Sequence, residues 1–447
     1  MTVPPLGLGA RFQTLIYKVV HSLDDWLKMT SSLIMNNRYF ALLANHKDYR
    51  YLWLAAVVSF LGDWFNTIAS VIIVSRYTDA GLAVGGIFLA RALPPFLLGP
   101  VAGVYADRFN RKHVMIFTDI ARAIIVLGFL LVNSADRVWL IYVLTALQFA
   151  ISSLFQPAQS ALLPTLVETD EELLLANTLS GATWSAMLAI GAAIGGFTAA
   201  LFGVEVALIA DAATFLLSAF LIAQIATEAS ISGKRSDLSG YRDFVEGMRY
   251  IINRPAVGLI ACVKGLFQIG SIDVMTAIYA NQLFPVGAEG ATSLGLMFMA
   301  SGVGAIIGPL IANRFNDNTL LSLQRWIGIG FGAVVVGWLI LGWAPSLPVV
   351  LIGLAMRLVG GAICWTYSNV ILQLKVPNQL LGRVTATDFA IYTLVTSISV
   401  WLTGYLLDTA QLEPRLLSTI FGVCSITAIV IWVFAQPMLN RDADTST

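Results

Sequence analysis

Long apolar runs separated by short polar segments make up most of this chain. Six runs of about 20 residues, the length that crosses a bilayer as an α-helix, begin near Leu52, Leu82, His113, Val138, Asn177 and Glu205. After a polar stretch from Glu228 to Pro255, six more begin near Ala256, Gly290, Leu321, Leu347, Gly382 and Glu413. We therefore expect an all-α membrane protein with twelve transmembrane helices in two pseudo-symmetric six-helix halves, a duplication that many transporters carry.

These boundaries divide the chain into five parts. We expect a cytoplasmic N-terminal segment (1–50), an N-terminal half (51–227), a cytoplasmic connector (228–255), a C-terminal half (256–437) and a cytoplasmic tail (438–447). Within the first segment, apolar residues from Phe12 to Leu27 recur at helical spacing between charged residues. This spacing favours an amphipathic helix on the cytoplasmic membrane surface. A helix packed against the bundle is the alternative.

Basic residues indicate which side of the membrane each loop faces, because Lys and Arg are retained on the cytoplasmic side. With the N-terminus inside, the external loops contain only Arg76, Arg137 and Arg415. The cytoplasmic segments and the connector then hold most of the other Lys and Arg residues. One cytoplasmic loop, Val167 to Ala176, is acidic instead, but acidic residues contribute little to orientation. We therefore place both termini in the cytoplasm.

Composition supports a membrane protein and excludes several classes of function. Hydrophobic residues make up 57% of the 447 residues, charged residues make up 12%, and the formal net charge is +0. This balance gives no basic surface for nucleic acid. The chain has no phosphate-binding Gly-x-x-x-x-Gly-Lys-Ser/Thr loop, no Gly-x-Ser-x-Gly motif and no metal-binding His pair. We expect neither an enzyme nor a bound cofactor or metal.

The loop after the second span carries a recognisable signature. It reads Gly99-Pro-Val-Ala-Gly103-Val-Tyr-Ala-Asp107-Arg108, followed by Arg111 and Lys112. This order of glycine, Asp-Arg and a basic cluster resembles the loop signature of the major facilitator superfamily. Other segments are similar to the branch that contains enterobactin and macrolide exporters: Leu61-Gly62-Asp63-Trp64, Phe155-Gln156-Pro157-Ala158, Ala176-Asn177-Thr178-Leu179 and Gly382-Arg383-Val384. The resemblance covers most of residues 49–437.

The resemblance implies the major facilitator fold and a conformational gate at this loop, to which Gly103, Asp107, Arg108 and Arg111 belong. We assign Asp119, Arg122 and Asp388 to the same gate group. Asp119 and Arg122 are three residues apart, a spacing that favours an ion pair on one helical face. Asp388 lies near the cytoplasmic end of the eleventh span.

Polar residues inside the spans are the candidates for a substrate or proton pathway, because a charge at the centre of a helix costs roughly 2.5 to 3.5 kcal/mol on insertion. In the first, fourth and seventh spans, polar residues recur on one helical face. The candidates are Asp63, Asn66, Arg91, Gln148, Gln156, Asp211, Lys264, Gln268, Asp273 and Arg357. The resemblance implies that the first, fourth, seventh and tenth spans line a central cavity. The alternative is structural, with hydrogen bonds between helices and an attractive pair of Asp63 with Lys264.

We expect a secondary transporter that works by alternating access. Aromatic residues near the polar stripes suit a small amphipathic organic substrate. The resemblance implies export of a siderophore- or drug-like compound across a bacterial inner membrane, with Asp63 and Asp211 as candidate proton carriers. We expect a monomer in the lipid bilayer with no nucleic-acid partner. Two alternatives are a lipid or lysolipid transporter of the same fold, and a non-transporting membrane assembly or sensor protein whose intramembrane charges are all paired.

The orientation is testable by accessibility labelling. Cysteines introduced at Ser232 and Thr445 should resist an impermeant thiol reagent applied outside intact cells, because both positions are predicted to lie in the cytoplasm. A cysteine at Asn133 should react. Labelling at Ser232 from outside would contradict the arrangement of six spans, a cytoplasmic connector and six spans.

Overall fold

The computed structural model describes residues 38–226, 240–317 and 319–444, and within these ranges it describes all side chains except those at 99–108, 240–244, 378–379 and 437–444. The described residues form helices, turns and bends without strands. The predicted amphipathic helix near Phe12 lies outside them. A short helix, α2 (Arg38–Asn45), precedes the six helices of the N-terminal half: α3 (Lys47–Tyr77), α4 (Gly81–Arg108), α5 (Arg111–Gly128), α6 (Trp139–Leu162), α7 (Asp170–Phe202) and α8 (Val204–Ala223).

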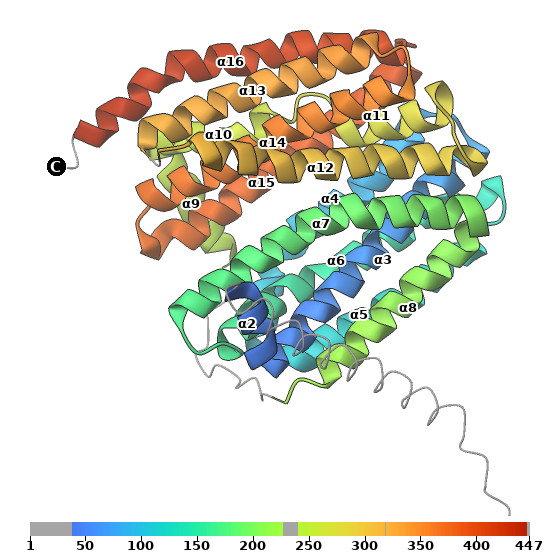
Figure 1. The fold of residues 1–447 in the computed structure, drawn as a ribbon, viewed down its shortest axis with the longest axis horizontal. Helices are drawn as coiled ribbons and strands as arrows, with labels where there is room; N and C mark the ends of the chain where they lie inside the picture. Colours follow the sequence, from blue (N-terminus) through green and yellow to red (C-terminus); the bar gives the residue numbers. More distant parts are fainter. Residues whose placement is uncertain (1–37, 227–239, 318, 445–447) are drawn as a thin grey trace, which may run out of the picture.

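The connector contains α9 (Gly240–Asn253). The C-terminal half then comprises α10 (Pro255–Leu266), α11 (Ile272–Ile278), the π-helical turn η4 (Tyr279–Leu283), α12 (Ala291–Phe315), α13 (Leu320–Trp343), α14 (Leu347–Lys375), α15 (Asn378–Asp408) and α16 (Pro414–Asp444). Figure 1 shows the two halves side by side, blue to green and yellow to red, with α7 and α12 between them. α16 continues to Asp444, past the predicted start of the tail at residue 438.

The predicted fold class is confirmed. Eleven of the described helices are long and apolar enough to cross a membrane, and α10, α11 and η4 together supply the remaining crossing. That crossing differs from the single continuous span we expected after Ala256. Phe267 to Ser271 interrupt the helix, with Gly270 at φ +76°, a conformation that glycine adopts without steric cost. Ser271 then caps the new helix by accepting from the Val274 N–H at 3.4 Å.

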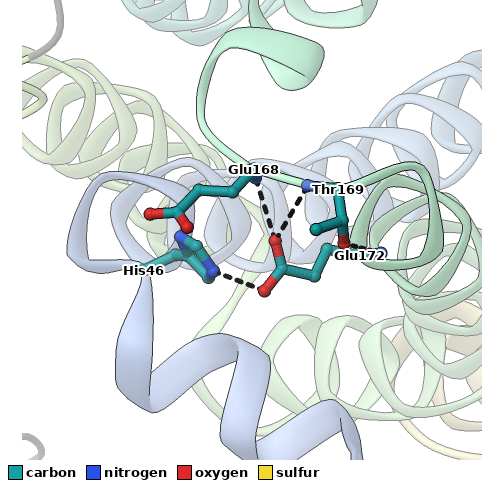
Figure 2. Close-up of polar contacts among 4 residues, drawn as sticks. All are labelled: His46, Glu168, Thr169 and Glu172. Carbon is teal, nitrogen blue, oxygen red and sulfur yellow. Dashed lines mark hydrogen bonds and ion pairs between the residues drawn. The ribbon is translucent and has the colours of Figure 1, made fainter.

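The acidic loop near Val167 is explained by the start of α7. Thr169 and Glu172 form a capping box: the Thr169 hydroxyl accepts from the Glu172 N–H at 3.2 Å, and the Glu172 carboxylate accepts from the Thr169 N–H at 3.2 Å. The same carboxylate accepts from the Glu168 N–H and lies 2.9 Å from His46 Nε2, at the N-terminus of α3 (Figure 2). Acidic side chains stabilise a helix N-terminus, so this loop is acidic for a local reason.

We call the end of the bundle where α3 ends and α4 begins the distal end, and the opposite end, with α2, the proximal end.

α7 and α12 bring the halves together through glycine. A Cβ on Gly196 would lie 2.6 Å from the Gly295 Cα, and a Cβ on Gly302 would lie 2.4 Å from the Ala189 N. Any side chain at these glycines would push the two helices apart.

Glycine also sets the contact between α12 and α14, and this gives a prediction. A Cβ at Gly304 would lie 2.1 Å from the Ala355 carbonyl oxygen, whereas a Cβ at Gly332 meets nothing within 4 Å. Gly304→Val should lower the free energy of unfolding by about 1–3 kcal/mol through overpacking. Gly332→Ala, the matched control, should be neutral or stabilising because Ala favours the helix. Thermal unfolding of the detergent-purified variants measures both, and equal midpoints would contradict the packing.

Candidate functional site

The first group of intramembrane charges joins α5 to α8. Asp119 and Arg122 form the ion pair that their spacing predicts, and both are almost fully buried. The Ser218 hydroxyl of α8 donates to the second Asp119 oxygen at 2.7 Å. The Arg122 guanidinium lies 4.9 Å from the Phe155 ring centre and 4.2 Å from that of Phe215. These contacts from three helices compensate both charges and fix them in place.

Asp211 of α8 has a different environment. Its side chain is 0% exposed, and neither carboxyl oxygen has a hydrogen-bond partner among the described residues. It packs against α3 at Gly62, where a Cβ would lie only 2.4 Å from Asp211 Oδ1 and 2.0 Å from the Thr214 hydroxyl. A carboxyl without partners in the low dielectric of a helix bundle is costly as an anion.

Asp63 and Arg91 lie close to this carboxyl but not in an ion pair with each other. Arg91 donates to the Thr67 hydroxyl, and its guanidinium lies 4.6 Å from the Phe149 ring centre. Thr67 in turn donates to the Asp63 backbone carbonyl at 2.6 Å. The half-buried Asp63 carboxylate has no hydrogen bond or ion pair among the described residues, although the charges of Arg91 and Arg122 act on it. Asp63 is thus the accessible acid beside a fully buried one.

In the C-terminal half, Lys264 and Asp388 form a buried ion pair. The Lys264 ammonium also donates to Asn369 Oδ1 at 2.7 Å and lies 4.6 Å from the Trp365 ring centre. This arrangement contradicts one interpretation of the sequence: the structural pair of Lys264 with Asp63 is wrong, because Lys264 has its partner within its own half. Asp388, which we assigned to the gate group, contacts the pathway candidate Lys264, and its role in a gate stays a prediction.

The interruption in the seventh crossing is held by its neighbours. The buried Arg357 donates to the Phe267 carbonyl at 3.2 Å and to Gln268 Oε1 at 3.5 Å. Ser399 of α15 donates to the Gln268 carbonyl at 2.7 Å. The polar stripe expected on one continuous helix is therefore divided, and its backbone carbonyls become acceptors. Asp273, half-buried at the start of α11, makes no ion pair, but the charges of Arg357 and Arg91 act on it.

The remaining candidates are spread along the N-terminal half. Asn66 and Gln148 are buried, and each has one side-chain atom without a partner among the described residues. Gln156 is exposed. Arg111 donates to the Ala161 carbonyl at 2.8 Å and so joins α5 to the end of α6. The side chains of Gly103, Asp107 and Arg108 lie outside the described residues.

Several residues at these sites escaped the sequence analysis. Ser218 lies seven residues after Asp211, on the same face of α8, and that spacing could have identified it. Asn369 follows Trp365 by one helical turn in the tenth span. The interruption after Phe267 had a signal as well, because Gly270 followed by Ser271 is a usual order for a helix end and a new N-cap.

The fold and these charges define the class of protein. Two six-helix halves enclose charged groups, some of which have no ion-pair partner, as expected of a secondary transporter. A family model described as Major Facilitator Superfamily matches residues 52–399. The chain belongs to the Major Facilitator Superfamily, which confirms the resemblance seen in the sequence and makes the protein a transporter and not an enzyme.

Individual relatives align with most of the chain. The putative bacilysin exporter BacE of Bacillus amyloliquefaciens is 22% identical over 395 residues, 87% of this chain and 95% of that protein. The enterobactin exporter EntS of Shigella boydii serotype 18 is 26% identical over 360 residues, 77% of this chain and 81% of that protein. A solved bacterial homologue of the iron transporter ferroportin, in its inward-facing state, superposes with a TM-score of 0.67 at 16% identity, covering 87% of this chain and 98% of that one.

The Lys264–Asp388 pair gives a prediction about stability. Lys264→Met or Asp388→Leu alone leaves an uncompensated buried charge and should cost about 3–5 kcal/mol of unfolding free energy. The double variant removes both charges and should recover most of the loss. A double-mutant cycle of thermal unfolding midpoints measures this coupling. A double variant no more stable than either single one would contradict a compensated pair.

Proposed function

We propose that this transporter exports a small amphipathic organic compound, siderophore- or drug-like, from the cytoplasm of a bacterium by proton-coupled alternating access. In this proposal the protein acts as a monomer in the inner membrane. The proximal end faces the cytoplasm and the distal end faces outside, as the basic residues predict. Relatives named as exporters support the direction of transport.

The observation that carries proton coupling is the unequal charge of the two halves. Away from the ends of its membrane crossings, the N-terminal half has three carboxyl groups, Asp63, Asp119 and Asp211, against two guanidinium groups, Arg91 and Arg122. By the same criterion, the C-terminal half has Asp273 and Asp388 against Lys264 and Arg357. A surplus carboxylate in a low-dielectric bundle needs a proton or a cation. The N-terminal half is therefore the half that takes up a coupling proton.

Asp63 and Asp211 are the groups that best fit this role. Asp119 is occupied by Arg122 and Ser218, so a proton there would break two strong contacts. Asp211 has no such contacts, and Asp63 is half-buried and unpaired. In our proposal Asp63 exchanges protons with the pathway, and Asp211 behind Gly62 holds one.

The substrate class follows from aromatic side chains of the C-terminal half. Tyr392 of α15 has aromatic neighbours on α14, in the interruption after α10 and on α15 itself, with ring centres 5.0 Å away for Trp365, 6.3 Å for Phe267 and 6.0 Å for Phe389. Aromatic surface with a few fixed charges suits an organic molecule that has both apolar and polar parts. We propose that polar side chains lie along the path of the substrate. They are those of Arg91, Arg357, Asn66, Gln148, Gln156, Gln268 and Asp273.

The proposed proximal gate is the signature loop of Gly103, Asp107, Arg108 and Arg111. Its support is the sequence motif together with the Arg111 contact to α6 and the Asp119–Arg122 pair that ties α5 to α8. We propose that Asp107 and Arg108 stabilise one conformational state through contacts at neighbouring helix ends.

The alternatives from the sequence are less well supported. An assembly or sensor protein was expected to pair all its intramembrane charges, yet Asp63, Asp211 and Arg91 have no ion pair among the described residues. A lipid transporter shares the fold, and substrate assays distinguish it from an exporter of water-soluble compounds.

The first experiment compares accumulation of labelled candidate compounds in cells with and without the gene, including lysolipids. With an exported compound in hand, Asp63→Asn should abolish concentrative export in inverted membrane vesicles but retain passive exchange. One coupled proton supplies about 2.3 kcal/mol per 100 mV of membrane potential, roughly a 50-fold gradient, which the variant should lose. Asp211→Asn should behave alike if Asp211 releases its proton during the cycle.

The matched control is Asp136→Asn in an exposed distal loop, which should transport normally. Wild-type gradients in both Asp63→Asn and Asp211→Asn, at every pH, would reject proton coupling through these carboxyls.

Normal transport by Asp107→Asn at wild-type expression would reject the gate role.

A further inference from the structure

The distal end of the bundle holds a set of polar contacts that join the two halves and that neither the sequence motifs nor the proposed pathway includes. Asp408, the last residue of α15, accepts from the first two amides of α4: its Oδ1 lies 2.6 Å from the Gly81 N, and its Oδ2 lies 2.8 Å from the Leu82 N. The C-terminal half thus supplies the N-terminal cap of a helix in the other half. First-turn amides have no partner within their own helix, so a carboxylate there satisfies two donors and the helix dipole together.

Close backbone packing sets the position of this cap. A Cβ at Gly404 would lie 2.8 Å from the Leu82 Cα, and a Cβ at Gly81 would lie 2.9 Å from the Leu407 side chain. α4 and α15 therefore approach each other at the turn where the carboxylate binds. A shift of the halves apart at this end removes both hydrogen bonds at once.

A second contact between the halves lies at the end of α3. Arg76 Nε donates to Glu289 Oε2 of the C-terminal half at 2.6 Å, while Arg76 Nη1 lies 3.4 Å from Glu205 Oε1 of its own half. Glu289 has φ +53°, the left-handed region, and lies between Gly287 at +79° and Gly290 at +73°. A non-glycine residue in this region is uncommon and is retained where surrounding contacts hold it.

Two neutral hydrogen bonds accompany these charged ones. Asn281 donates to the Ser75 hydroxyl at 2.7 Å, and Gln282 donates to the Asp79 carbonyl at 3.0 Å. Both link the C-terminal half to the end of α3 or the turn after it. Among the described residues, the charged contacts between the halves at this end therefore depend on two carboxylates, Asp408 and Glu289.

The geometry points to a distal latch, formed by Asp408 on the α4 N-terminus and by Glu289 on Arg76, that stabilises the state closed at the distal end and sets how often that end opens. The latch rests on the alternating access of the proposed function, but it concerns the equilibrium between conformations and not the substrate or the coupling ion. Opening exchanges three charge-assisted contacts for water, two made by Asp408 and one between Arg76 and Glu289. The turn that holds Glu289 at a positive φ can relax when Arg76 moves away.

The chain offers a matched test, because Arg76 has one partner in each half. Glu289→Gln weakens the contact between halves, and Glu205→Gln weakens the contact within one half. Spin labels at Asn133 and Ser346, on distal loops of opposite halves, report the separation by double electron–electron resonance. The exposed Cys262 and Cys424 are first replaced by serine.

We expect Asp408→Asn to raise the ratio of distally open to closed protein by roughly tenfold, the effect of losing charge-assisted hydrogen bonds to two amides. Glu289→Gln should raise this ratio by about two- to fivefold, because the Arg76 and Glu289 side chains are 30% and 43% exposed and water weakens such an ion pair. Glu205→Gln should leave the distance distribution unchanged. When Glu205→Gln is also present, the double variant Arg76→Glu with Glu289→Arg reverses the ion pair between the halves. This variant should have the closed population of the wild-type protein. Wild-type distributions in both latch variants, or an equal shift from Glu205→Gln, would overturn the latch.

Size-exclusion profiles and circular dichroism establish that each variant is folded. The distances are measured without substrate, so the result does not depend on the exporter assay. If the vesicle assays show no proton-coupled export but the latch variants shift the distance distribution, the proposed function is rejected and the latch stands. If export is proton-coupled but the latch variants keep the wild-type distance distribution, only the latch is rejected.

Discussion

The structure depends above all on the cost of placing charge inside a membrane. With no water to solvate them, intramembrane charges must find partners or remain neutral. Asp119 with Arg122, and Lys264 with Asp388, meet this requirement through ion pairs, hydrogen bonds and aromatic faces. These groups therefore act as fixed points around which helices pack. In our proposal the groups left without ion pairs, Asp63, Asp211 and Arg91 among them, take part in the transport cycle.

Glycine provides the second constraint, because it brings helix backbones together where no side chain fits. Gly196 and Gly302 join the halves through α7 and α12, and Gly404 brings α15 against α4. Helices in contact through small residues have few interlocking side chains and can separate with little rearrangement. The same contacts that close the bundle at its distal end are thus compatible with opening it.

Much of the fold could be predicted from the sequence, because a span needs about 20 apolar residues and the chain supplies twelve such runs. Most helices start within five residues of the predicted position; α7 starts earlier, at Asp170, since its first turn is acidic. The Asp119–Arg122 pair followed from local spacing. The partner of Lys264 and the partnerless burial of Asp211 did not, because contacts between spans depend on helix rotation and depth, which hydropathy does not contain. The interruption at Gly270 was missed because the run remains apolar on both sides of it.

The surplus carboxyl group of the N-terminal half lies where proton coupling can be linked to movement of the two halves. Asp211 contacts α3 at Gly62, next to Asp63, while Arg76 at the end of the same helix contacts Glu289 of the other half. α3 therefore carries an unpaired acid near its middle and a latch residue at its distal end. We propose that a change in protonation at this site alters how α3 packs on α8 and, through the helix, the contact of Arg76 with Glu289. Because α3 is a continuous helix of 31 residues, it is the one element described here that joins the proposed proton site directly to the contacts between the halves.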